Sequence, residues 1–104
     1  MATIETSTIG AVTLALDAAL LRHQAIAANI ANVNTEGYQP VRVSFEEHLG
    51  TQAARVERVG GDAKVALDVE VAHLSANTVH YQALLRALNK QLAILGTAIN
   101  EGKR

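Results

Sequence analysis

Two heptad ladders, one at each end of the chain, constrain its fold more than any other feature. In each ladder, mostly apolar residues recur in alternating steps of three and four, a spacing typical of helices that pack lengthwise on other helices. The first ladder consists of Ile9, Val12, Leu16, Ala19, His23, Ile26, Ile30 and Val33. The second consists of Leu67, Val71, Leu74, Thr78, Tyr81, Leu85, Leu88, Leu92, Leu95 and Ile99. We therefore expect long helices at about residues 9–33 and 66–101.

Both expected helices have apolar stripes wider than one partner would cover. Leu14, Leu21 and Ala28 flank the first ladder, and Leu84, Ala87, Ile94 and Ala98 flank the second. Stripes of this width favour more than one neighbour for each helix. A self-contained helical hairpin, monomeric or dimeric, and a subunit of a larger helical assembly both fit the pattern.

The middle of the chain has a different character. Val41, Val43 and Phe45 alternate with polar residues, which indicates a short strand or an extended arm. Residues 46–58 are charged with scattered apolar positions, and they could be helical, loose or ordered only by a partner. We predict a mainly α protein with a single domain over residues 1–104. Its terminal helices pack as an antiparallel, coiled-coil-like pair, and its middle, about residues 34–65, is extended or partly disordered and could include a short β element.

Composition argues against several classes of function. The net charge is −1 with no basic run, so nucleic acid is not an expected partner. There is no cysteine, and no uninterrupted apolar run approaches the roughly 20 residues that span a bilayer. The four histidines lack the spacing of a metal site, because His73 and His80 lie about two helical turns apart. No nucleophile context is visible, and we expect no enzyme activity, no metal and no cofactor.

An asparagine cluster follows the first ladder. Asn29, Asn32 and Asn34 fall within six residues and precede Gly37. Asparagine and glycine favour helix ends and turns, because asparagine side chains compete for backbone hydrogen bonds and both residues tolerate the left-handed conformation. The cluster predicts a defined bend that fixes where the next segment leaves the helix.

Two stretches resemble a known family. Residues 21–38, which read LRHQAIAANIANVNTEGY, resemble the N-terminal signature of bacterial flagellar rod, hook and hook-associated proteins, which centres on Asn-Ile-Ala-Asn followed by Asn-Thr-Pro-Gly-Tyr. Residues 67–85 resemble the closing helix of the same group. The small size and the pattern of residues 67–85 are most similar to the proximal rod proteins of type B. Glu36 stands where the family usually has proline.

The resemblance implies a structural subunit of the proximal rod of the flagellar basal body, self-assembling with other rod proteins into a hollow drive axle. The implied partners are other rod subunits, the basal adaptor subunit, and the export gate or membrane ring at the rod base, with no direct membrane insertion. The implied location is the periplasmic part of the basal body, reached through the flagellar type III export apparatus rather than through a secretory signal. The alternatives are another small axial protein of the rod (type C) and a cytoplasmic helical-bundle adaptor.

The family match also implies assembly residues. Those of the bend that follows the first helix are Asn29, Ala31, Asn32, Thr35, Gly37 and Tyr38. Those that would carry helix packing in the second helix are Leu74, Tyr81, Leu85, Leu88 and Leu92.

Overall fold

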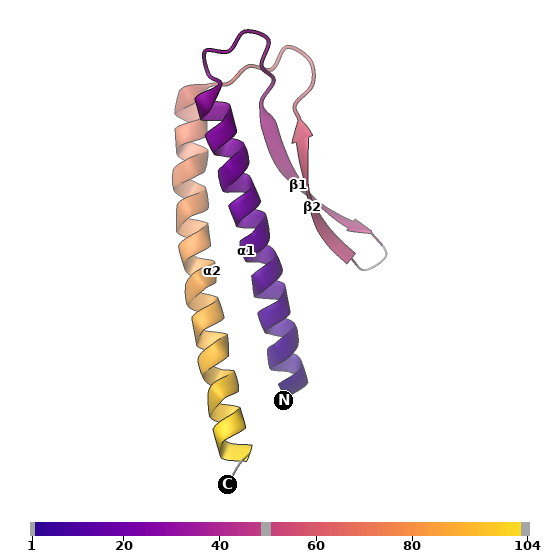
Figure 1. Ribbon diagram of the computed structural model, residues 1–104, viewed down its shortest axis with the longest axis vertical. Coiled ribbons are helices and arrows are strands. Elements are labelled where there is room, and N and C mark those ends of the chain that lie inside the picture. Colours follow the sequence, from indigo (N-terminus) through magenta and orange to yellow (C-terminus); the bar gives the residue numbers. More distant parts are fainter. Residues whose placement is uncertain (1, 49–50, 103–104) are drawn as a thin grey trace.

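Two long antiparallel helices and one β-hairpin make up the computed structural model, which describes the backbone of residues 2–48 and 51–102 and the side chains of residues 8–44 and 55–102. The order is α1 (Ala2–Ala31), β1 (Val41–His48), β2 (Thr51–Arg58) and α2 (Leu67–Gly102). In Figure 1 the helices lie side by side, both termini are at one end, and the hairpin leaves from the other end and diverges from α1. The molecule is an elongated body of 64 × 30 × 14 Å. The predicted mainly α fold with long terminal helices is confirmed.

Helix α1 ends two residues earlier than the ladder predicts. The backbone N–H of Asn32 is shared between the carbonyls of Ala28 (3.1 Å) and Asn29 (3.2 Å). The backbone N–H of Val33 donates to the Ile30 carbonyl at 3.3 Å. Bonds three residues back replace the regular bonds four residues back, a tightening common at helix ends. The helix thus closes at Ala31 and the chain enters a turn.

The segment Thr8–Ala31 of α1 is long and apolar enough to cross a membrane by length and composition. Core helices of proteins outside membranes meet the same criterion. Asp17 and Arg22 interrupt the segment, so it is not an uninterrupted apolar run.

Alanine dominates the buried apolar residues in the described part of α1. Ala18, Ala19, Ala25 and Ile26 are its buried apolar residues, and Ala19 and Ile26 belong to the predicted ladder. His23, which the ladder places on the same seam, is exposed. Ala19 lies at the contact with α2, since its carbonyl accepts from the Asn77 amide, and a small residue at such a contact lets two helix backbones approach closely.

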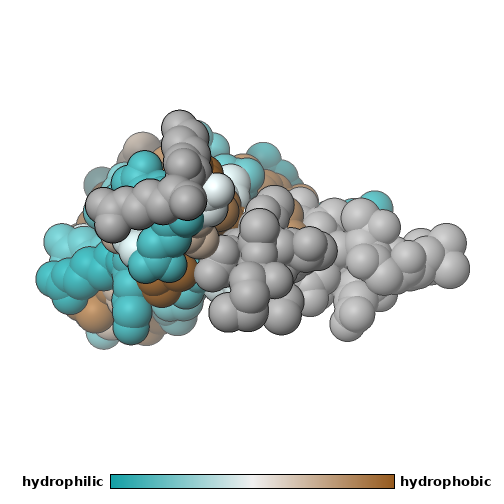
Figure 2. Space-filling model, turned by 90° about the horizontal axis from the view of Figure 1, so that it is seen from below, coloured by the Kyte–Doolittle hydropathy of each residue, from teal (hydrophilic) through white to brown (hydrophobic). Residues whose placement is uncertain are grey.

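Helix α2 turns a different face inward from the one that its apolar ladder predicts. An inner stripe of less exposed residues runs in alternating steps of four and three through Glu70, Leu74, Asn77, Tyr81, Leu84, Leu88, Gln91, Leu95 and Ala98. Four ladder residues lie on it, while the others form an outer stripe that is exposed: Leu67, Val71, Thr78, Leu85, Leu92 and Ile99. Asn77 is drawn inward because its amide donates to the Ala19 carbonyl at 2.9 Å. Figure 2, which views the end that carries the termini, shows brown apolar residues at the surface among teal polar ones.

The middle of the chain is a regular hairpin. All eight positions of β1 pair antiparallel with β2, from Val41 opposite Arg58 to His48 opposite Thr51. The short strand expected from Val41 and Val43 is present. Residues 51–58, for which the sequence allowed helix, loose chain or partner-induced order, form the second strand because β1 supplies their hydrogen-bonding partner.

Candidate assembly site

Asn29, in the last turn of α1, is the centre of a buried polar cluster. Its amide nitrogen donates to the Val41 carbonyl at 3.0 Å and to Oε2 of Glu70 at 3.1 Å. Its amide oxygen accepts from the Val41 N–H at 2.8 Å and from the Tyr38 hydroxyl at 3.4 Å. The side chain is 0% exposed, and both its donors and both its acceptor positions are used. One side chain therefore fastens α1 to β1 and to α2.

Glu70, in the first turn of α2, is also 0% exposed. Its Oε1 pairs with Nη2 of Arg42 at 2.5 Å, and Nη1 of the same guanidinium donates to the Val41 carbonyl at 3.1 Å. The positive end of the α2 dipole favours a carboxylate at this place. We call Asn29, Tyr38, Val41, Arg42 and Glu70 the joint network, because together they connect three elements at one point.

The turn that follows α1 is built by the asparagine cluster. The Asn32 amide nitrogen donates to the Ala28 carbonyl at 2.8 Å, and its oxygen accepts from the Thr35 hydroxyl at 3.1 Å. The Tyr38 N–H then reaches the Thr35 carbonyl at 3.3 Å across a turn in which Gly37 has φ = 77°. A positive φ at the third residue is typical of a type II turn, whose second residue is often proline. Glu36 occupies that second position, so the usual family proline would fit this backbone.

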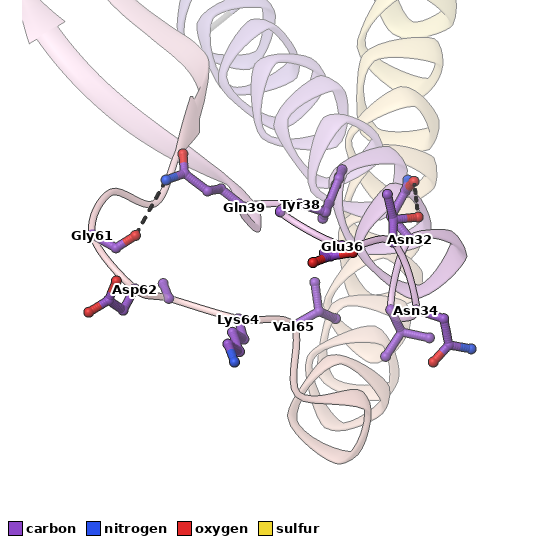
Figure 3. Close-up of a pocket in the computed structure, with 13 residues that line it drawn as sticks. Asn32, Asn34, Glu36, Tyr38, Gln39, Gly61, Asp62, Lys64 and Val65 are labelled. Carbon is purple, nitrogen blue, oxygen red and sulfur yellow. Dashed lines mark hydrogen bonds between the residues drawn. The ribbon is translucent and has the colours of Figure 1, made fainter.

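Beside this turn, residues 38–39 contact residues 58–61. The Arg58 guanidinium lies 5.5 Å from the centre of the Tyr38 ring and donates to the Gln39 carbonyl at 3.1 Å. The Gln39 amide donates to the Gly61 carbonyl at 3.4 Å, a bond that Figure 3 shows beside an open hollow between residues 32–39 and 61–65. The hollow is lined mainly by loop backbone and surface side chains. Within the described part of the chain, no group of three or more histidine, cysteine or acidic residues could hold a metal ion.

The structure gathers most of the predicted bend residues at the joint. Asn29 and Tyr38 belong to the joint network, and Asn32, Thr35 and Gly37 build the turn beside it. Ala31 is the exposed last residue of α1. The residues predicted for α2 divide between its two stripes: Leu74, Tyr81 and Leu88 are partly buried, and Leu85 and Leu92 are exposed. Leu85 and Leu92 thus leave a large part of their apolar surface uncovered in the single chain, at 38% and 47% exposure.

Sequence reasoning did not assign roles to Glu70, Arg42 and Asn77. Glu70 and Asn77 are seven residues apart and share a stripe with Leu84, so a polar residue repeating at one heptad position was an available signal. Arg42 gave no signal of its own, because its partner lies 28 residues away in sequence.

Comparison with known proteins points in one direction. The family pattern described as "Flagella basal body rod protein" matches residues 13–39, which include the joint residues Asn29 and Tyr38. The chain is 27% identical to the flagellar basal body rod protein FlgB of Bacillus subtilis (strain 168) over 116 aligned positions, covering 86% of this chain and 90% of that protein. It is 37% identical to the flagellar hook protein FlgE of Treponema pallidum (strain Nichols) over 82 positions, which cover 73% of this chain and 18% of the hook protein. The rod-family match and the similarity to one rod protein over nearly its whole length together support a flagellar basal-body rod protein that is FlgB-like.

Proposed function

We propose that this structural subunit of the flagellar rod packs in the rod wall through the outer stripe of α2, with the joint network fixing where its hairpin points. The rod family and the FlgB homologue support the structural role. The outer stripe of α2 is the surface that meets neighbouring subunits.

The outer stripe is the observation that carries the proposal. Val71, Leu85, Leu92 and Ile99 are all exposed large apolar residues on one helix, and the helix is 36 residues long, or about 54 Å at 1.5 Å per residue. Burying one such side chain completely contributes roughly 1.5–3 kcal/mol. An exposed apolar row of this length is typical of a surface that another protein covers.

The joint network supports the second half of the proposal. A buried carboxylate, amide and guanidinium hold their geometry only when every group is paired. Because Asn29, Arg42 and Glu70 come from three elements, the direction of the hairpin relative to the helices is fixed by hydrogen bonds. A fixed arm is what a subunit needs if it contacts the same neighbour at every position of an assembly.

We place the chain in the proximal rod, in contact with other rod subunits and with the adaptor subunit and export gate at the rod base, reaching the periplasmic space by type III export. The support is the similarity to FlgB over 90% of that protein. A role without catalysis is supported by a site made of structural hydrogen bonds.

The test is genetic replacement in the source bacterium, followed by electron microscopy of purified basal bodies. Deleting the gene should abolish the rod and motility, and the intact gene should restore both. Supplying it to a strain that lacks only its type C rod protein should restore neither. Normal rods in the deletion strain would overturn the proposal and favour an adaptor role, and rescue of the type C strain would move the chain to the other rod position.

A further inference from the structure

The outer edge of β2 has the features of a self-recognition site. We propose that two copies of the chain outside the rod pair their β2 strands antiparallel, around a two-fold axis through Val56. This dimer is separate from the rod contacts proposed above and does not depend on them.

The backbone groups of the hairpin alternate in direction along each strand. Val59 N–H donates to the Pro40 carbonyl at 2.8 Å, so this pair is hydrogen-bonded within the hairpin. Because bonded and non-bonded pairs alternate along antiparallel strands, the pairs Val41–Arg58 and Val43–Val56 direct their N–H and C=O groups away from the partner strand. Val41 confirms this alternation independently, since its backbone N–H and C=O both point away from β2 and bond with the Asn29 side chain.

The edge of β2 that faces away from β1 is open. The backbone groups of Val56 and Arg58 point away from β1, and no hydrogen bond from another described residue reaches them. In Figure 1 the last part of β2 lies on the far side of β1 from α1. Val56 is 50% exposed. An open strand edge is a template for a further strand.

The charges on β2 select a second copy of the chain as the partner and one register for the pairing. When Val56 of one copy lies opposite Val56 of the other, Arg55 of each copy lies opposite Glu57 of the other, which gives two attractive pairs. Shifting one β2 strand against the other by two residues, to the next register on either side, places Arg55 opposite Arg55 or Glu57 opposite Glu57. Like charges directly opposite each other destabilise a strand pair. Arg55 also has a contact within its own chain, and a guanidinium with five N–H donors can serve both.

A consequence follows from the symmetry. A two-fold contact uses the same patch on both copies and closes on itself, whereas a filament needs contacts that do not close. The β2 dimer therefore cannot propagate along a polar rod. The β2 dimer would hold chains in pairs before they enter the rod. Each pair would have to separate before its chains are added to the rod.

The experiment is disulfide trapping in the full-length chain, which has no cysteine of its own. In a hydrogen-bonded antiparallel pair, Cα atoms lie about 5.5 Å apart, inside the range that a disulfide bridges. The V56C variant should form a covalent dimer under mild oxidation at least roughly tenfold faster than the V79C variant, because pairing raises the effective concentration of the two thiols. Val79 is the matched control, since it is 67% exposed on α2 and lies off the proposed contact.

Charge reversal then tests the register. Adding R55E or E57R to V56C should slow cross-linking roughly tenfold, because each change turns two attractive pairs into repulsive ones. Combining both reversals with V56C should restore the rate, because the charges are complementary again. Equal rates for V56C and V79C would overturn the proposal. A triple variant as slow as the two charge-reversed variants, with hairpin and helix content unchanged by circular dichroism, would also overturn it.

Discussion

The side-chain amide of Asn29 pairs with both backbone groups of Val41, accepting the N–H at 2.8 Å and donating to the carbonyl at 3.0 Å. The asparagine side chain thus occupies the place that a neighbouring strand would take at the edge of β1. Its second N–H continues to Glu70 in α2. One residue in the last turn of α1 therefore links the end of that helix to the start of the hairpin and the start of the other helix.

Replacing Asn29 by alanine should lower the free energy of unfolding by about 3 kcal/mol, because a buried donor or acceptor left without a partner costs about 1–3 kcal/mol. The Val41 N–H loses its acceptor, and Glu70 loses one of its two partners. Urea unfolding followed by circular dichroism measures the change. Asn34→Ala is the control, since Asn34 is exposed and surface substitutions usually change stability by about 0.5 kcal/mol or less. Equal effects of the two substitutions would contradict the central role of Asn29.

The Arg42–Glu70 pair should show strong coupling in a double-mutant cycle. Arg42→Met leaves a buried carboxylate with only Asn29 as a partner, and we expect a loss of about 2 kcal/mol. This is less than the full cost of breaking a buried pair, because the Arg42 side chain is 40% exposed. Changing both residues to methionine should cost less than the sum of the single changes by about 1–2 kcal/mol. Additive losses in the urea midpoints would show that the pair does not act as a unit.

Introducing proline at position 36 should stabilise the turn. Glu36→Pro fits the second position of the turn and reduces the freedom of the unfolded chain, which typically contributes about 0.4–1 kcal/mol. The neighbouring Gly37→Ala should instead cost about 1 kcal/mol, because φ is 77° there and side chains disfavour that region. Thermal unfolding of both variants measures the two opposite shifts. A destabilising Glu36→Pro would mean that the Thr35–Tyr38 turn is not of this type.

Part of this architecture is readable from the sequence, for identifiable reasons. Long apolar ladders predict helices whatever those helices pack against. Asn32 and Gly37 predict the end of α1, because few other residues favour the turn conformations found at helix ends. The alternation of Val41 and Val43 reports β1. These features depend on local chemistry, so one segment is enough to reveal them.

The rest depends on distant partners. Both stripes of α2 are apolar enough to be buried, and the inner one is chosen by what α1 offers: small residues at Ala18 and Ala19 and the buried amide of Asn29. Glu70 and Asn77 turn inward because their partners are on α1 and β1. Strand β2 has no regular alternation, and only its pairing with β1 makes it a strand. The joint network therefore could not be assembled from the ladders alone.

The two stripes of α2 should respond differently to a charge. Leu88 is partly buried on the inner stripe, and Leu88→Asp should destabilise the isolated chain by about 2 kcal/mol or more, because an unpaired charge in an apolar contact is costly. Leu92 on the outer stripe is 47% exposed, and Leu92→Asp should leave the stability of the isolated chain within about 0.5 kcal/mol of wild type. Circular dichroism melts of the two purified variants measure this contrast.

In cells the outer-stripe variant should still fail, because the surface that a neighbouring subunit covers now carries a charge. Motility in soft agar and electron microscopy of basal bodies measure rod assembly. Asn89→Asp is the control, since it adds a charge at an exposed polar position of the same helix and should swim normally. Wild-type motility in Leu92→Asp cells would remove the outer stripe from the rod contacts, and helix packing within the subunit would then be the only role left for the ladder of α2.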